Sequence, residues 1–191
     1  MDRTERTKEK FKRLFGGAPT ENEGTDPEFM RILQRFIFGK VSYEGSLDDK
    51  LRELITVTVL TVNQTLPQLK AHVGACLNTG LTPTEIREAF YRCAPFIGFP
   101  KTLNAIAAMN EVFASKGIEL PLEDCGTVGE EDRREAGRRS SSLYTGTRSP
   151  PHTLGFRRAS VKAFRCGLRS FVSAILPPEK VWTARRANCL P

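Results

Sequence analysis

The segment that decides the fold class is residues 47–64, LDDKLRELITVTVLTVNQ. Its valine, isoleucine and threonine content would suit a strand, because β-branched side chains favour extended backbone. Two features favour a helix instead: the segment is 18 residues long, and Ser46 followed three residues later by Asp49 resembles a capping box. Apolar residues lie almost all the way round such a helix, so we expect residues 47–64 to form a central helix of the domain.

A second helix is predicted just upstream, from Asp26 onward. Asp26 can cap it, Pro27 sits at a position where its missing N–H costs nothing, and Glu28 faces the positive end of the helix dipole. The apolar residues that follow have helical spacing and form one stripe: Phe29, Ile32, Leu33, Phe36 and Ile37. An amphipathic helix is therefore expected here.

Three more helices are predicted downstream, and no part of residues 1–120 has the pattern of a paired strand. Each has a start or stop signal of a recognised kind, such as a proline at the first helical position or a glycine just past the end. They are residues 67–79, stopped by Gly80; residues 83–93, started by the capping box TPTE at 82–85; and a stripe of Leu103, Ile106, Met109 and Phe113 that ends near Gly117. The fold class predicted is all-α.

The charge of the chain changes near residue 130. Residues 1–129 carry 16 Lys and Arg against 17 Asp and Glu, whereas residues 130–191 carry 13 against 5. Serine and proline runs interrupt this basic stretch and no apolar period persists, a composition that cannot bury enough surface to order itself. We expect a disordered basic C-terminal tail, with residues 161–176 as its one candidate helix.

Three parts are therefore predicted: an N-terminal helix and linker at residues 1–24, a helical domain at 25–120, and a linker with the tail at 121–191. The excess positive charge lies in the tail, which contains no recognisable nucleic-acid-binding module, so nucleic acid is not the expected partner.

The sequence also indicates where the protein works. The charged N-terminus leads into no apolar signal segment, and the longest apolar stretch, residues 54–62, is far shorter than the about 20 residues of a membrane helix. The five cysteines stand at unrelated spacings with no metal-binding pattern, which fits a reducing compartment. We expect a soluble cytoplasmic protein with no membrane partner and no metal site.

His72 is the one histidine of the predicted domain and the first candidate for chemistry. It shares a helix face with Gln68 and Cys76, at the margin of the apolar side, where small changes of environment move a histidine pKa across neutrality. Glu53 lies along an apolar face of the preceding helix, and a carboxylate there needs a partner. We expect Glu53 to pair with His72.

Two alternatives stay open at this point. A lone helical histidine beside apolar residues is often a structural residue. Glu53 could instead form a salt bridge with Lys50, or with Arg52 of a neighbouring copy.

Four runs of residues, in order, resemble the carboxymuconolactone decarboxylase family. They are LDDKLRELI from residue 47, QLKAHV from residue 68, GLTPTEIRE from residue 80 and GFPKTLNA from residue 98, and IFG at 37–39 fits as well. The resemblance covers about residues 25–117. It implies an alkylhydroperoxidase D-like domain of about six helices that assembles as a homotrimer or homohexamer, with sites near subunit contacts.

The alkylhydroperoxidase D branch of this superfamily carries a Glu, two cysteines and a His at fixed spacing. This chain has Glu53, Thr65, Gln68 and His72 at those positions, so both redox cysteines are missing. A thiol peroxidase needs a thiolate, and we do not expect that activity. Some family members contain two tandem copies, so a truncated or out-of-frame second copy is one interpretation of the tail.

The resemblance implies a cofactor-independent decarboxylase acting on an unsaturated carboxylated lactone. Such a lactone accepts the electrons left by departing CO₂, and the protein supplies a proton, for which His72 is the candidate general acid/base and Glu53 its partner. Arg52, Gln68 and Lys101 are the candidate substrate-binding residues. The alternatives are an antioxidant protein that uses Cys76 or Cys93, and a non-catalytic oligomeric binding module.

Overall fold

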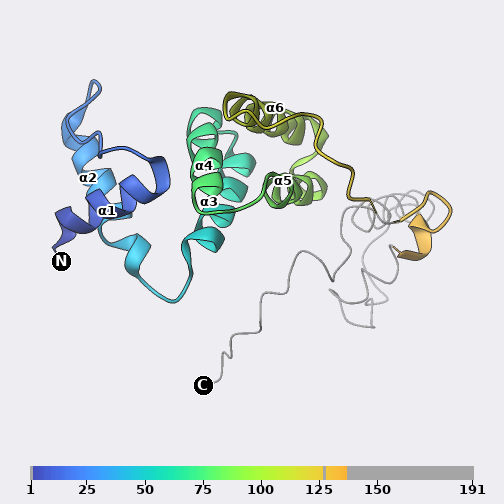
Figure 1. Ribbon diagram of the computed structural model, residues 1–191, viewed down its shortest axis with the longest axis horizontal. Helices are drawn as coiled ribbons and strands as arrows, with labels where there is room; N and C mark the ends of the chain where they lie inside the picture. The colour runs from blue at the N-terminus through green and yellow to red at the C-terminus, as the bar shows by residue number, and fades with distance from the viewer. Residues whose placement is uncertain (1, 127, 137–191) are drawn as a thin grey trace, which may run out of the picture. The chain divides into compact units, whose positions relative to one another are not determined.

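The computed structural model describes residues 2–126 and 128–136 and divides the chain into two units, Met1–Leu122 and Glu123–Pro191 (Figure 1). The predicted disorder of the tail and the candidate helix at 161–176 lie outside the described residues. The first unit contains all of the numbered helices and both candidate catalytic residues.

Within the described ranges the chain is all-helical, with no strand, which confirms the predicted fold class. The helices, in chain order, are α1 (Arg3–Phe15), α2 (Pro27–Ile37), the short 3₁₀ helix η1 (Val41–Tyr43), α3 (Asp49–Asn63), α4 (Leu66–Asn78), α5 (Pro83–Ile97) and α6 (Phe99–Ser115). The segment at 47–64, which could have been a strand by composition, is a helix and packs against α4, α5 and α6.

Helices α2 and α5 begin at the residues that the sequence predicts, after side-chain caps at Asp26 and Thr82. The carboxylate of Asp26 accepts a hydrogen bond from the backbone N–H of Phe29 at 3.1 Å. Thr82 and Glu85 form the reciprocal capping box at the start of α5. These contacts span three residues, so the sequence alone contains the information that places them.

The predicted cap of α3 is wrong. Asp48, not Ser46, is the N-cap, and its carboxylate accepts from the backbone N–H of Leu51 at 2.8 Å. The reason lies in Arg52, whose guanidinium donates to backbone carbonyls of the preceding loop at Val41, Glu44 and Leu47. These bonds hold the loop in a non-helical course, so the helix cannot begin until residue 49.

Helix α5 is longer than predicted. It continues past Cys93 to Ile97, with Pro95 inside it. A proline removes one backbone donor but does not end a helix that is held by packing on its other faces. The helix ends at Gly98, where φ is +82° and the N–H donates to the carbonyl of Ala94 at 2.9 Å.

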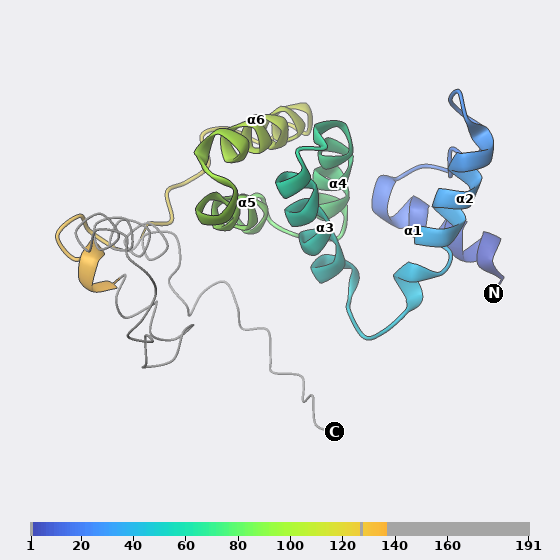
Figure 2. The same cartoon turned by 180° about the vertical axis from the view of Figure 1, so that it is seen from behind.

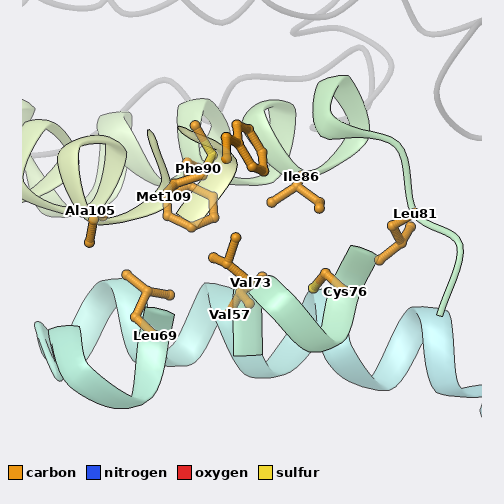
Figure 3. Close-up of a cluster of buried hydrophobic side chains, with 11 residues drawn as sticks. Val57, Leu69, Val73, Cys76, Leu81, Ile86, Phe90, Ala105 and Met109 are labelled. Carbon is orange, nitrogen blue, oxygen red and sulfur yellow. The ribbon is translucent and has the colours of Figure 1, made fainter. Parts of the chain in front are cut away.

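The main core lies between the α3–α4 pair and the α5–α6 pair. Figures 1 and 2 show α3 and α4 side by side, and Figure 3 shows their side chains pointing toward those of the other pair. The completely or almost completely buried members are Val57, Leu69, Val73, Cys76, Leu81, Ile86, Phe90, Ala105, Ala108, Met109 and Phe113. Burying one such aliphatic or aromatic side chain contributes about 1.5–3 kcal/mol, so this cluster holds the four helices as one body.

Helix α1 adds a second, smaller core on the outer side of α4. Leu14, Phe38 and Ala75 are buried there, with Phe11 and Phe15 packed against them. The chain approaches α1 closely at Gly39, where a Cβ atom would lie 2.5 Å from the carbonyl oxygen of Arg3. No helix in the described residues is both long and apolar enough to cross a membrane.

Candidate active site

The site is built on the pair α3 and α4, which are joined by the short turn at Gln64 and Thr65. Gln64 adopts a left-handed conformation with φ of 58°, and its side-chain amide donates to the backbone carbonyls of Thr61 and Lys101 at 2.7 and 3.0 Å. This bridge ties the turn to the start of α6 and fixes how α3 and α4 lie against each other.

Every fourth residue of α3 is buried, and this line places Glu53 against α4. Its members are Asp49, Glu53, Val57 and Thr61. On α4 the fully buried residues are Leu69, Val73, Ala75 and Cys76, whereas His72 lies at the edge of that face with 19% of its side chain exposed. The histidine is therefore half-enclosed, and the carboxylate behind it is buried.

The structure brings His72 and Glu53 together. His72 Nδ1 and Glu53 Oε2 lie 2.7 Å apart. An ionised carboxylate can only accept a hydrogen bond, so the tautomer that fits an ionised Glu53 has its proton on Nδ1 and donates the hydrogen bond to Oε2. The other ring nitrogen, Nε2, is then the atom that can exchange a proton with a substrate, and the carboxylate balances the charge of the ring whenever both nitrogens are protonated.

The alternative partner of Glu53 on its own helix is engaged elsewhere. Lys50 Nζ donates to the backbone carbonyl of Gly80 at 2.9 Å and so links the start of α3 to the end of α4. Glu53 is thus paired with the imidazole and not with this lysine. An imidazole held by a carboxylate in this way is chemically capable of general acid/base catalysis.

A third side chain of the site was not predicted from the sequence. The ring of Phe15 in α1 lies against His72 edge to face, with centroids 5.4 Å apart and an interplanar angle of 81°. Phe11, Leu14 and Phe15 have the i, i+3, i+4 spacing of an apolar helix face. That signal predicts an amphipathic helix, but it contains no information about which helix the face covers.

Comparisons with known proteins identify the family of the chain. A model of the carboxymuconolactone decarboxylase family matches residues 27–111. The 4-carboxymuconolactone decarboxylase of Acinetobacter baylyi is 32% identical over 91 residues, which are 48% of this chain and 68% of that protein. The chain belongs to the carboxymuconolactone decarboxylase family.

Two further relatives are similar over shorter stretches. A 15.0 kDa protein of Paracoccus denitrificans is 34% identical over 84 residues, 43% of this chain and 63% of its own length. The nitrosuccinic acid decarboxylase of Metarhizium robertsii is 29% identical over 75 residues, 39% of this chain and 52% of its own length. The matched region of the family thus includes α3 and α4 but not α1, which ends before residue 27.

The predicted substrate-binding residues of this family member lie in different surroundings. Gln68 is exposed on α4, one turn before His72. Lys101 has an exposed side chain in the first turn of α6. The guanidinium of Arg52, in contrast, is engaged with the loop carbonyls described above, at 3.0 Å from that of Leu47 and 3.3 Å from that of Val41. Substrate binding by all three remains a prediction.

The cysteines of this domain are poorly placed for thiol chemistry. Burial, reinforced by the nearby charge of Glu53, raises the pKa of the Cys76 thiol far above its ordinary value. Burial also raises the pKa of Cys93. Both therefore stay protonated and poorly nucleophilic at neutral pH. In the described part of the chain, no group of three His, Cys, Asp or Glu side chains is arranged to hold a metal ion.

Proposed function

We propose that the chain is a cofactor-independent decarboxylase of an unsaturated carboxylated lactone, with His72 as its general acid/base. The observation that carries the proposal is the 2.7 Å hydrogen bond between His72 Nδ1 and Glu53 Oε2. It joins a partly exposed imidazole to a buried carboxylate on the helix pair that the family model covers.

The reaction breaks one carbon–carbon bond and forms one carbon–hydrogen bond. The bond between the carboxylate and the carbon that carries it breaks, CO₂ leaves, and the electron pair is delocalised into the conjugated lactone carbonyl. A proton from His72 Nε2 then forms the new C–H bond, and the neutral ring recovers a proton from water. A positioned proton donor of this kind contributes about 10²- to 10⁴-fold to the rate.

Glu53 has two tasks in this scheme. Its hydrogen bond fixes Nδ1 as a donor, so Nε2 faces the substrate, and its negative charge stabilises the ring while both nitrogens carry protons. Gln68 and Lys101 are proposed to bind polar groups of the substrate because their side chains are exposed in the first turns of α4 and α6, and the turn at Gln64 that joins α3 to α4 is bonded to the backbone of Lys101. Arg52 is proposed to contribute chiefly by holding the loop that precedes α3.

The names of two relatives support the reaction type. One is a decarboxylase of 4-carboxymuconolactone and another a decarboxylase of nitrosuccinic acid. Carbonyl and nitro groups both withdraw electrons, so both names denote acids that can accept the electron pair left behind. An acid with such a group beside its carboxylate is the substrate class proposed for this chain.

The antioxidant alternative has less support. Its branch of the superfamily uses two cysteines where this chain has Thr65 and Gln68, and the thiols of Cys76 and Cys93 are held protonated by burial. A non-catalytic binding module would use the same side chains without proton transfer. It predicts that substrate acids bind but no CO₂ is released.

We further propose that copies of the chain assemble as a homotrimer or homohexamer, as the family resemblance implies. Large apolar side chains are exposed on α2, on α3 and around the start of α6, which is the composition of a contact surface. They include Phe29, Ile32, Phe36, Ile55, Val59, Val62, Phe96, Phe99 and Leu103. Light scattering on the purified chain measures the assembly directly.

The test of the reaction is CO₂ release from a panel of unsaturated carboxylated lactones and nitro acids. We expect His72→Gln to reduce turnover by about 10²-fold or more. We expect a smaller loss for Glu53→Gln, which keeps an oxygen acceptor for Nδ1 but loses the charge. Cys125→Ser, at an exposed thiol, is the matched control and should behave as the unmodified protein. Turnover that survives His72→Gln, or no turnover with any acid of the panel, contradicts the proposal.

A further inference from the structure

Helix α1 lies ahead of the segment matched by the family model, yet it is anchored to both helices that carry the site. Its first anchor is a buried ion pair, in which Lys10 Nζ lies 2.7 and 3.0 Å from the two carboxylate oxygens of Asp49. The two side chains are only 9% and 8% exposed. Asp49 stands one helical turn before Glu53 on the buried face of α3, so this anchor fixes α1 beside the acidic member of the site.

The second anchor lies further along α1 and reaches α4. Leu14 is buried against Ala75. The side-chain amide of Asn78 donates to the backbone carbonyl of Leu14 at 2.7 Å. These two contacts hold the end of α1 on the outer face of α4, and the next residue, Phe15, thereby meets the ring of His72.

Phe15 is itself held by other aromatic rings. Phe11 lies 4.7 Å away between centroids, and Phe38 lies 5.5 Å away at an interplanar angle of 80°. Offset and edge-to-face arrangements of this kind are the ones that aromatic pairs prefer. The ring of Phe15 is therefore a fixed surface for the histidine to pack on.

A single hydrogen bond does not fix the plane of an imidazole ring. The ring of His72 turns about its Cβ–Cγ bond, and small rotations about that bond keep Nδ1 within hydrogen-bond reach of Glu53 Oε2. The edge-to-face contact with Phe15 opposes that rotation, because turning the ring breaks the preferred geometry. With both contacts in place, the direction of Nε2 is determined.

We propose that Phe15 is a positioning residue of the site, which together with Glu53 fixes the plane of His72 so that Nε2 meets the carbon to be protonated. Its effect on rate rests on the proposed decarboxylase function, whereas the orientation of the ring can be measured without a substrate. Helix α1 is then a part of the site that the family match does not include.

The kinetic test uses three variants. Phe15→Leu removes the ring but keeps an apolar side chain, and Phe15→Tyr keeps the ring. Phe11→Leu is the matched control, because Phe11 belongs to the same helix and the same aromatic cluster but is not in ring contact with His72. Misplacing a reacting group by about 1 Å can cost up to about 100-fold in rate, so we expect about a 10-fold lower kcat for Phe15→Leu with KM little changed. Phe15→Tyr should keep kcat, and Phe11→Leu, which removes one support of the Phe15 ring but no ring contact with His72, should lower kcat by less than Phe15→Leu does.

The orientation test uses nuclear magnetic resonance of the protein alone. We expect a nuclear Overhauser contact between the rings of Phe15 and His72. We also expect Phe15→Leu to shift the resonances of the His72 ring protons by more than Phe11→Leu does. A His152→Gln variant identifies the signals of the second histidine. Phe15→Met replaces Phe15→Leu if circular dichroism shows that the latter is unfolded.

The outcomes separate the two proposals. If no acid is decarboxylated, the proposed function fails, and the resonance experiment still decides whether Phe15 orients His72. Unchanged His72 signals in Phe15→Leu overturn the positioning role. Equal losses of kcat in Phe15→Leu and Phe11→Leu overturn it as well, because they would show a general packing effect.

Discussion

Helices α1 and α2 are neighbours in the sequence and both are amphipathic, yet their apolar faces lie in different surroundings. Helix α1 turns its apolar face inward, where Leu14 is 2% exposed. Helix α2 buries Gln34, whereas Phe29, Ile32 and Phe36 are 57%, 59% and 57% exposed. The apolar face of α1 is covered within one chain, and that of α2 is not.

The contacts around each helix explain the difference. Helix α1 lies along α4 and is tied to α3 by the buried pair of Lys10 and Asp49. Helix α2 packs on α1 and η1, and its buried Gln34 donates a hydrogen bond to the hydroxyl of Thr20 at 2.8 Å. A polar inner face and an apolar outer face are what a helix needs if its outer face meets a second copy. The comparison thus separates a helix that we propose as part of the site from one that we propose as a contact surface for a second copy.

The largest expected effect comes from breaking the anchor of α1. Asp49→Ala leaves the ammonium of Lys10 buried without its partner, and removing one member of a buried ion pair costs about 3–5 kcal/mol of unfolding free energy. Denaturation by urea measures the loss. The matched control is Glu21→Ala, which breaks the more exposed pair of Glu21 with Arg35 near α2 and should cost about 1 kcal/mol or less. Equal losses for the two variants would mean that α1 is not held more firmly than α2.

A middle-sized effect is expected from changing the exposed face of α2. Ile32→Glu should weaken self-association by about 1.5–3 kcal/mol for each copy, because that is the gain from burying such a side chain. Its cost to the fold of a single chain should be small, since the side chain makes little contact there. Light scattering at several protein concentrations gives the assembly size, with Glu28→Gln on the same helix as the control. An unchanged mass for Ile32→Glu would exclude this face from the assembly.

What the sequence could predict of the fold follows from the range of the interactions. The starts of α2 and α5 depend on Asp26 and Thr82, which bond residues three positions on, and both were predicted. The predicted start of α3 was wrong by two residues, because Ser46 and Asp48 are both residue types that can cap a helix. The choice is made by Arg52, which reaches back as far as Val41. The spacing of neighbouring residues in the sequence does not predict such a contact.

The same limit applies to the site. His72 and Glu53 could be predicted as partners because each is a polar side chain on an apolar helix face, and the two helices are consecutive. Phe15 could not, because its contact with His72 depends on how α1 lies on α4. That arrangement is set by Lys10 with Asp49 and by other long-range contacts, none of which has a local signature.

The smallest expected effect tests how the segment after α2 is tied to α1. The hydroxyl of Tyr43 in η1 donates toward the backbone carbonyl of Arg6 at 3.2 Å and toward Glu9 at 3.3 Å. Burial, followed by the charge of Glu9, raises the pKa of Tyr43 above its ordinary value. A group whose pKa is raised by folding contributes stability that is complete below the unfolded pKa, about 10 for tyrosine, and is lost as the pH rises beyond it.

Tyr43→Phe should therefore lower the unfolding free energy at neutral pH by only about 0.5 kcal/mol, since the ring keeps its contact with Lys10 at 4.8 Å and the lost hydrogen bond is largely exposed. The decline of stability above about pH 10 should be less steep than in the unmodified protein. Denaturation by urea at several pH values measures both, and Glu9→Gln should reduce the same decline by a smaller amount. Tyr43→Phe could instead lose stability above pH 10 as steeply as the unmodified protein. In that case ionisation of Tyr43 does not weaken the contact between η1 and α1, and other contacts hold η1 to α1.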